Sequence, residues 1–320
     1  MNLPRIPVTI LVPVFNGSKH IKSGVNSIIR MANKSDEVLI IDDGSNDDSV
    51  SQIMEFARNY ENINFISRQH FGLVDTLNFG IRESANTLIA RADIDDLYSP
   101  KRIQRQVELM STSTNLAAVF SDYQFISGDR KDLGILPSAI HPDLVHLSLI
   151  NHQRTPHSSV MFNKESVIDA GGYLPSDYPA EDLALWIRLA RFSNLSSVPE
   201  VLLKYTINPN GITGSSNNLM RGKTRTLQAS LIQDLDFETI YINLHFLLEP
   251  YSKIPLADTR RALVLRDLLT LIRLSGNSRA KILRDVSKLT KSFNIPKLTI
   301  PISSLARDRH RRMTFKSTGD

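Results

Sequence analysis

The 320-residue sequence contains no cysteine, and this absence excludes several kinds of chemistry. Disulfides, thiolate metal sites and cysteine nucleophiles are impossible, and a chain without thiols fits a reducing compartment. No apolar run approaches the roughly 20 residues that a membrane-spanning helix needs. The early apolar run from Val8 to Phe15 ends at Asn16-Gly17 without a small-residue cleavage site, so no secretory signal is predicted. We therefore expect a cytoplasmic protein, which could lie at the inner face of the cell membrane.

Two glycine-rich nucleotide-binding motifs are also missing. The chain has no Gly-x-Gly-x-x-Gly and no complete Gly-x-x-x-x-Gly-Lys-Ser/Thr phosphate loop, so neither a dinucleotide fold nor a Walker-type site is supported. The rest of the composition is ordinary, with 41% hydrophobic and 22% charged residues. A chain of this size can form one large α/β domain, or a domain with an appendage.

Positive charge is concentrated at the carboxyl end of the chain, whose formal net charge is +5. From Arg260 onward lysines and arginines far outnumber the acids, which are only Asp267, Asp285, Asp308 and Asp320. Such a segment favours an anionic partner. Apolar residues recur between the arginines at helical spacing, so residues 260–316 could lie on anionic lipid or pack as an ordinary helix against the rest of the protein. The sequence leaves both readings open.

Strand-like and helix-like patterns alternate through the first two thirds of the chain. Apolar runs at 8–12, 38–41, 64–66, 87–92 and 116–120 predict strands, and amphipathic segments between them predict helices. This succession is typical of a doubly wound, mainly parallel Rossmann-like sheet, in which ligands bind at the carboxyl ends of the strands. After the turn-rich segment 208–218 the pattern becomes helical and basic. We therefore place a domain boundary at 217, with a helical region over 218–320.

The most informative segment is Ala90-Arg91-Ala92-Asp93-Ile94-Asp95-Asp96, which follows the apolar run from Thr87. Carboxylates crowded at the end of a buried strand repel one another unless a positive group lies between them. Hard cations such as Mg²⁺ and Mn²⁺ take oxygen ligands and often share them with phosphates. The segment thus suggests a metal that holds a phosphorylated ligand, although a solvated acidic turn has the same composition.

Other polar motifs follow strands or open helices, and each is ambiguous alone. Pro13-Val14-Phe15 ends the first strand, and Asp42-Asp43-Gly44-Ser45 ends the second, where an Asp could accept from a nucleobase or ribose or simply cap a helix. Glu181-Asp182 opens a helix, where acids favour the dipole but could also serve as a general base. His157 could contact phosphate, metal or an acceptor, or be a structural histidine.

The ordered set of motifs resembles glycosyltransferase family 2, the inverting sugar-nucleotide transferases of GT-A fold. The resemblance covers roughly the first two thirds of the chain and is specific because the motifs occur in one order. The matching segments are Val12-Pro13-Val14-Phe15-Asn16, Asp42-Asp43-Gly44-Ser45, Gly72-Leu73 through Asn78-Phe79-Gly80-Ile81, Ala90 to Asp96, Arg102-Ile103-Gln104-Arg105-Gln106, Gly171-Gly172-Tyr173 and Glu181-Asp182 through Trp186.

The resemblance implies a role for each matching residue. It implies a transferase that moves a sugar from a nucleotide sugar, with a bias to UDP, to a glycan or lipid-linked acceptor in surface-polysaccharide or O-antigen-type synthesis. It also implies a divalent metal, Mn²⁺ or Mg²⁺. The donor would contact Pro13, Phe15, Asp42, Asp43, Arg91 and Asp93; the metal would bind Asp95, with Asp93 and Asp96 close by; Asp182 rather than Glu181 would be the catalytic base; and Gly171, Gly172, His157 and Trp186 would lie on the sugar or acceptor side.

One segment departs from the family pattern. Many relatives carry Tyr-Arg-x-His after the catalytic helix, where this chain has Tyr205-Thr206-Ile207-Asn208. Contacts made by the missing Arg and His must be lost or replaced, and His157, Arg221 or Lys223 are the candidates to replace them.

Three other functions explain less of the sequence. A non-catalytic module that binds a sugar nucleotide stays open because of the altered Thr206 segment. A nucleic-acid-binding protein would account for the basic end but not for the acidic cluster, and aromatics for base stacking are scarce there, so no nucleic acid is expected. An aspartyl phosphatase would need its acid pair after the first strand, where this chain has Pro13-Val14-Phe15.

Overall fold

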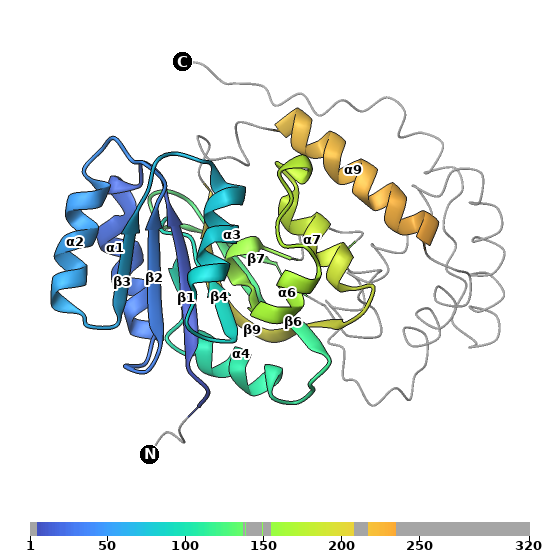
Figure 1. Cartoon of the computed structure of the whole chain (residues 1–320), viewed down its shortest axis with the longest axis horizontal. Coiled ribbons are helices and arrows are strands. Elements are labelled where there is room, and N and C mark those ends of the chain that lie inside the picture. Colours follow the sequence, from blue (N-terminus) through green and yellow to red (C-terminus); the bar gives the residue numbers. More distant parts are fainter. Residues whose placement is uncertain (1–4, 137, 139–148, 150–154, 208–216, 235–320) are drawn as a thin grey trace.

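A mixed sheet of nine strands runs through the part of the chain that the computed structural model describes, which is residues 5–136, 138, 149, 155–207 and 217–234 (Figure 1). The strand order is β3-β2-β1-β4-β8-β6-β9-β5, and β7 pairs with the outer part of β6. The strands are β1 (Val8–Val14), β2 (Glu37–Asp42), β3 (Ile63–Ser67), β4 (Leu88–Arg91), β5 (Leu97–Tyr98), β6 (Leu116–Ile126), β7 (Asp132–Leu136), β8 (Met161–Asn163) and β9 (Asn194–Thr206).

Helices cover both faces of this sheet. They are α1 (Ser18–Met31), α2 (Ser49–Asn59), α3 (Leu73–Glu83), α4 (Arg102–Met110), α6 (Lys164–Asp169), α7 (Glu181–Leu189) and α9 (Asn217–Asp234), with short 3₁₀ turns η3 (His157–Ser159) and η4 (Pro175–Asp177). One apolar core joins the sheet to α3, α6 and α7, and a second joins it to α1, α2 and α4. Burial on both faces explains why the first strands read as uninterrupted apolar runs.

Strands β3, β2, β1 and β4 are parallel, as the alternating sequence pattern predicts. Leu11 of β1 packs into one core while its neighbours Ile10 and Val12 pack into the other. The register pairs Val14 with Asp42 and Leu11 with Arg91. The carboxyl ends of these four strands therefore meet at one edge of the sheet, which is the edge where ligands bind in folds of this class.

Pro13 lies inside β1 and does not end the strand, as the sequence suggested it would. Leu11, two residues earlier, accepts a hydrogen bond from the backbone N–H of Ala92 at 2.9 Å, so this side of β1 faces β4. Pro13 faces the same side because backbone groups alternate along a strand. Strand β4 has ended at Arg91 by that point, so the missing N–H of proline costs no ladder hydrogen bond.

The other half of the sheet was not predicted in detail. Strand β8 has three residues and runs antiparallel to both β4 and β6. Strand β9 pairs in parallel with β6, but the register slips where Val198 is followed by Pro199 and Glu200. A proline within a strand removes a donor, and pairing resumes at Val201. Strand β8 is too short and β9 is interrupted, so neither shows the continuous apolar run by which a strand is recognised in a sequence.

Ser99-Pro100 predicts a helix that begins at the proline, but helix α4 starts two residues later, at Arg102. Ser99 and Pro100 precede it, and the backbone N–H of Lys101 donates to the Ser99 side chain at 3.3 Å before the helix begins at Arg102. Ser18 is the first residue of α1 and not its cap: Gly17 occupies the N-cap position, and the Ser18 backbone N–H donates to Asp47 at 3.0 Å.

The last described helix, α9, packs beside α7, with Leu231 buried in the core that α7 shares (Figure 1). Residues 235–320, which include the basic segment 260–316, and Asn208 lie outside the described residues. The boundary at 217 and the lipid-binding role of the basic segment stay predictions. Among the described helices, none combines the length and the apolar character needed to cross a membrane.

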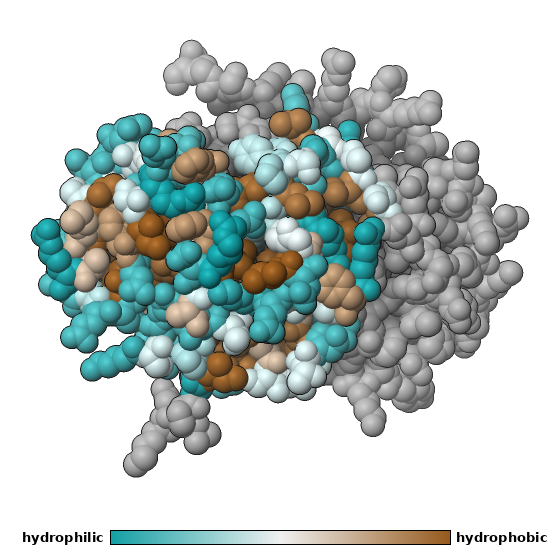
Figure 2. Space-filling model, in the orientation of Figure 1, coloured by the Kyte–Doolittle hydropathy of each residue, from teal (hydrophilic) through white to brown (hydrophobic). Residues whose placement is uncertain are grey.

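On the described part of the face in Figure 2, apolar residues lie in small groups between hydrophilic ones. This face offers no single broad apolar surface within the described ranges.

Residues 92–96, between β4 and β5, form a loop with three aspartates that we call the acidic loop. Helix α1 contacts this loop directly through Gly24. A Cβ built on Gly24 would lie 2.0 Å from the carbonyl oxygen of Ile94, which is a backbone atom and cannot rotate away. The glycine thus allows α1 to pack against the loop that carries the three aspartates.

We predict that Gly24→Ala destabilises the protein by about 1–3 kcal/mol, as overpacking usually does. The sign is diagnostic, because alanine in a helix interior is normally favoured over glycine by about 1 kcal/mol. The matched control is Gly222→Ala in α9, where a Cβ meets nothing within 4 Å and the change should stabilise. Urea unfolding measures both, and a stabilised Gly24→Ala variant would contradict the packing described here.

Candidate functional site

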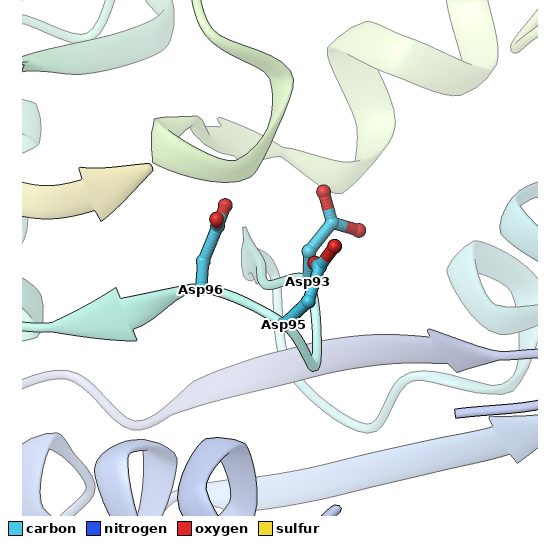
Figure 3. Close-up of side chains that lie close together, drawn as sticks. All are labelled: Asp93, Asp95 and Asp96. Atoms are coloured by element: carbon cyan, nitrogen blue, oxygen red, sulfur yellow. The ribbon is translucent and has the colours of Figure 1, made fainter. Parts of the chain in front are cut away.

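Three aspartates from the loop between β4 and β5 lie close together at the carboxyl edge of the sheet. Oxygens of Asp93, Asp95 and Asp96, one from each, lie within 4.8 Å of one another, and the side chains point to the same side of the loop (Figure 3). Tyr98 fixes the loop, because its hydroxyl oxygen accepts from the Asp93 N–H at 2.6 Å and its proton is donated to the Asp93 carbonyl at 3.0 Å. The arrangement offers the hard oxygen ligands that Mg²⁺ and Mn²⁺ prefer.

The three carboxylates differ in how many partners they already have. Asp96 is buried and accepts from the Ser158 hydroxyl at 2.5 Å and from the Thr206 N–H at 2.8 Å, so each of its oxygens is engaged. Asp93 pairs with Arg91. The carboxylate of Asp95 makes no hydrogen bond to another of the described residues, although its backbone carbonyl accepts one from Thr206. Asp95 is therefore the most available metal ligand of the three, and Asp96 holds the loop in place.

Burial and mutual repulsion oppose ionisation in this cluster. The pKa values of Asp95 and Asp96 are both raised, first by burial and then by the charge of Asp93. For Asp95 the charges of His20 and Arg91 act in the opposite direction. Three acids held together against their repulsion are the donor set that a divalent cation would stabilise. His20, in the first turn of α1, was not singled out by sequence reasoning because nothing in its spacing marks it.

Arg91 is a buried cation in the middle of these acids, with 4% of its surface exposed. Burial opposes its charge, but Asp93 and the hydroxyls of Tyr173 and Tyr98 outweigh that effect and raise its pKa above the usual value. The backbone below it is held by Arg102 of α4, whose guanidinium donates to the carbonyls of Arg91 at 2.7 Å and Val160 at 3.1 Å. Helix α4 therefore fixes the strand end from which the acidic loop departs.

The ends of β1 and β2 form a second part of the site. The Asp43 carboxylate accepts from the backbone N–H groups of Phe71 at 3.0 Å and Gly72 at 2.9 Å, and it also pairs with His70 at 2.8 Å. Phe15 is 47% exposed and stacks on His70, with ring centroids 4.2 Å apart. Asp43 thus shapes an exposed aromatic surface, and His70 is a member of it that the sequence did not reveal.

Asp42 and Gly44 complete this second part. Asp42 is buried and accepts from the Ser45 N–H at 3.3 Å and the Ser67 hydroxyl at 3.1 Å. Gly44 has φ +78° and a Cβ there would meet the His70 backbone nitrogen at 2.7 Å, so glycine is required. Pro13, two positions before Phe15 in the sequence, is partly buried.

The acid pair at the start of α7 is the third part. Glu181 is only 5% exposed, and its Oε2 has no hydrogen-bond partner among the described residues. Burial, and then the neighbouring charge of Asp182, raises the pKa of Glu181 to about 7, while Arg91 opposes the shift. Asp182 is partly exposed and accepts from the Leu183 N–H at 2.7 Å. Because Arg91 acts on Glu181 and also pairs with Asp93, the start of α7 and the acidic loop belong to one site.

The residues expected on the acceptor side have different surroundings in the structure. His157 bonds through Nε2 to the Tyr173 hydroxyl at 2.7 Å, close to the acid pair. Gly172, with φ +65°, is required because a Cβ there would lie 2.7 Å from Asn78 Oδ1, whereas a Cβ on Gly171, with φ +83°, meets nothing within 4 Å. Trp186 does not fit the expectation: its ring has 0% exposure and packs edge-on against Phe120 with centroids 5.2 Å apart, so it belongs to the core.

The similarity of this chain to known proteins shows which family it belongs to. Residues 9–170 match the family described as Glycosyl transferase family 2. The chain belongs to glycosyltransferase family 2. It is 28% identical over 207 residues to the Escherichia coli UDP-Gal:alpha-D-GlcNAc-diphosphoundecaprenol beta-1,3-galactosyltransferase, which covers 62% of this chain and 73% of that protein. As the family resemblance implied, the protein is a glycosyltransferase.

Solved structures show the same GT-A fold. S. aureus TarS 1–349 in complex with UDP-GlcNAc has a TM-score of 0.59 at 15% identity and covers 90% of this chain and 92% of that one. The mannosyltransferase PcManGT from Pyrobaculum calidifontis, in complex with GDP-Man and Mn²⁺, has a TM-score of 0.57 at 15% identity and covers 91% and 83%. The Rossmann-like, mainly parallel fold predicted from the sequence is confirmed.

In this glycosyltransferase, Thr206 of the segment that departs from the family pattern forms hydrogen bonds with the acidic loop. The Thr206 N–H donates to Asp96, and its hydroxyl donates to the Asp95 carbonyl at 2.6 Å. The Arg130 guanidinium donates to the Thr206 hydroxyl at 3.3 Å and to Ser23 at 3.2 Å. Arg130 is thus the cation found beside Thr206, and sequence reasoning missed it because its loop lies 76 positions away.

Of the three residues suggested as replacements, none lies beside Thr206 in a described contact. Lys223 donates to the Ser176 carbonyl, and His157 faces Tyr173. Arg221 is exposed on α9.

We predict that Glu181→Gln stabilises the folded protein more at pH 8 than at pH 5. The pKa of Glu181 rises from 4.5 to about 7 on folding, so its contribution to stability is complete below pH 4.5 and is lost as the pH rises through about 7. Glutamine does not ionise and avoids that loss. The free energy of unfolding in urea should therefore favour the variant at pH 8 by on the order of 1 kcal/mol more than at pH 5.

Glu165→Gln, at an exposed position of α6, is the control and should show no such dependence on pH. Equal effects of Glu181→Gln at both pH values would show that Glu181 ionises normally.

Proposed function

We propose that this glycosyltransferase is a metal-dependent inverting enzyme that moves a sugar from a UDP-sugar to a hydroxyl group of a glycan or lipid-linked acceptor. The observation that carries the proposal is that one buried cation, Arg91, forms an ion pair with Asp93 of the acidic loop and also acts on the charge of Glu181 in the acid pair of α7. A group that binds a diphosphate and a group that can remove a proton are thereby brought to one place.

The choice of donor and acceptor is supported by the relatives. The Escherichia coli protein is named for a UDP-sugar and a diphosphoundecaprenol acceptor, and TarS binds UDP-GlcNAc. The exposed Phe15–His70 stack beside Asp43 is a suitable surface for a planar base, because aromatic rings stack on bases without regard to their identity. We therefore assign the base to this surface and the diphosphate to the acidic loop.

The residues of the acidic loop fit a divalent cation. Asp95 has oxygens with no partner among the described residues, and Asp93 lies beside it, so these two would hold the ion, as the Mn²⁺-bound mannosyltransferase also suggests for the fold. When bound, the cation would neutralise the charge of the departing diphosphate. Asp96 keeps the loop in position from behind through Ser158 and Thr206.

Asp182 removes the proton of the acceptor hydroxyl. That hydroxyl oxygen attacks the anomeric carbon of the donor sugar, the bond from this carbon to the diphosphate oxygen breaks, and the configuration inverts. Asp182 is better suited than Glu181, because it is partly exposed, whereas burial raises the pKa of Glu181 to about 7 and leaves it about half protonated at neutral pH. A protonated Glu181 can instead donate a hydrogen bond to the sugar or the acceptor.

We predict that Asp182→Asn lowers kcat by about 10²- to 10⁴-fold, the usual contribution of a general base. The amide keeps the acceptor oxygen for the Leu183 N–H, so the fold and the affinity for UDP should be retained. Transfer and donor hydrolysis are measured with a panel of nucleotide sugars and Mn²⁺, with Asp169→Asn on the exposed end of α6 as the control.

Loss of UDP affinity together with transfer would argue that Asp182 is structural. Absence of transfer and hydrolysis by the unaltered chain with every donor, combined with tight binding of one of them, would favour a non-catalytic sugar-nucleotide-binding module.

We predict that Asp95→Ala weakens Mn²⁺-dependent UDP binding at least tenfold, since even residues behind a metal ligand typically change metal affinity by about 10- to 100-fold. Titration calorimetry with and without Mn²⁺ measures the effect, and Asp169→Ala is the matched control. The same UDP affinity in wild type and Asp95→Ala, with Mn²⁺ present, would exclude Asp95 as a ligand.

A further inference from the structure

Tyr173 and His157 form a hydrogen-bonded pair to which the proposed mechanism gives no role. The two side chains come from separate segments, η3 and the turn after α6, and meet at 2.7 Å between His157 Nε2 and the Tyr173 hydroxyl. Tyr173 is almost completely buried, so this hydroxyl contacts protein groups and not bulk water.

The backbone of Tyr173 is fixed from two sides. The side-chain amide of Asn78 on α3 accepts from the Tyr173 N–H at 2.9 Å and donates to the Tyr173 carbonyl at 2.7 Å. Arg188 on α7 donates to the carbonyls of Ala170 at 3.0 Å and Gly172 at 2.5 Å, which are the residues leading to Tyr173. Two helices thus hold one short turn, and the turn determines where the hydroxyl lies.

The pair covers the face of α7 that carries Asp182. Residues four apart share a helix face, so Trp186 lies next to Asp182 along the helix. The ring centroid of Trp186 is 6.0 Å from that of His157 and 6.5 Å from that of Tyr173. His157 and Tyr173 therefore pack against the helix face that carries Asp182, one turn along α7 from it.

The charges around the Tyr173 hydroxyl are those of the proposed catalytic site. Its pKa is raised well above the usual value by burial; Arg91 opposes this, and the charges of Asp182, Glu181 and Asp93 add to it. The hydroxyl is consequently a neutral group that can donate one hydrogen bond and accept others. A change in the position of the hydroxyl would alter its electrostatic interactions with the acid pair and with Arg91.

We propose that the His157–Tyr173 pair positions the acid pair of α7 for proton removal, with Tyr173 as a positioning residue that His157 holds in place. The inference rests on the proposed role of Asp182 as the base. It predicts that the hydroxyl matters separately from the aromatic ring, because the ring alone is sufficient for packing against Trp186.

The test compares Tyr173→Phe, His157→Leu, the double variant and His157→Gln, after transfer by the wild-type chain has been established with its best donor and acceptor. Tyr173→Phe keeps the ring and removes the hydroxyl, and we expect kcat to fall roughly ten- to hundredfold, as for small misplacements of catalytic groups. The donor KM and the Mn²⁺-dependent affinity for UDP should stay within about twofold. His157→Gln, which can still bond to the hydroxyl, should recover part of the kcat that His157→Leu loses.

The double variant shows whether the two residues act as a unit. If they do, Tyr173→Phe combined with His157→Leu has a kcat no lower than the worse single variant. Tyr60→Phe, which removes a hydroxyl from the exposed end of α2, is the control and should change nothing. Urea unfolding of each variant separates a fall in kcat from a loss of folded protein.

Two results would overturn the inference alone: a wild-type kcat in Tyr173→Phe, or kcat losses that multiply in the double variant. If Tyr173→Phe does not fold, the comparison of His157→Leu with His157→Gln decides, and equal kcat in these two overturns the inference. Absence of transfer by the wild-type chain with every donor would overturn the proposed function itself.

Discussion

The site depends on one buried positive charge surrounded by acids that repel one another. Arg91 pairs with Asp93, lowers the pKa of Glu181 against the effect of burial, and acts on the Tyr173 hydroxyl. Removing that cation would leave the acidic loop and the start of α7 as two groups of like charge in a region with little water, which is strongly unfavourable. Two factors therefore bring distant segments together at this sheet edge: the order of the strands, and the attraction of the surrounding acids to Arg91.

A buried arginine needs its own support, and α4 supplies it. Arg102 has no exposed surface, and its guanidinium donates to backbone carbonyls on two neighbouring segments, those of Arg91 at the end of β4 and Val160 just before β8. Gln106, one turn later, donates to the Ser159 carbonyl at 2.7 Å and accepts from Arg102 at 3.0 Å. The motif that contains these residues was recognised in the sequence as part of the family pattern, and the structure gives it a physical purpose: it orders the backbone from which the acidic loop departs.

Sequence reasoning succeeded where the signal was local and failed where it was distant. The apolar runs of β1, β2 and β4 predicted the parallel half of the sheet, and the aspartates after them were placed at its edge. The partners of those aspartates could not be found in this way: Ser158 and Thr206 bond to Asp96 across 62 and 110 positions, and neither residue type marks a site. Trp186 shows the opposite error, because a large aromatic near an acid pair suggests a ligand contact, whereas its ring is buried in the core against Phe120.

The altered segment at Thr206 shows how a family pattern can change without loss of the loop. The bond to Asp96 comes from the backbone N–H of residue 206, and any residue except proline can supply it. The side chain is therefore free to vary, and here its hydroxyl donates to the Asp95 carbonyl, a second bond that an arginine at this position would have to make with a longer and more flexible group. A guanidinium still lies at this point, because Arg130 reaches it from the turn between β6 and β7, with the left-handed φ of 68° that this turn requires of it. The positive charge beside Thr206 thus comes from the turn between β6 and β7 and not from β9 itself.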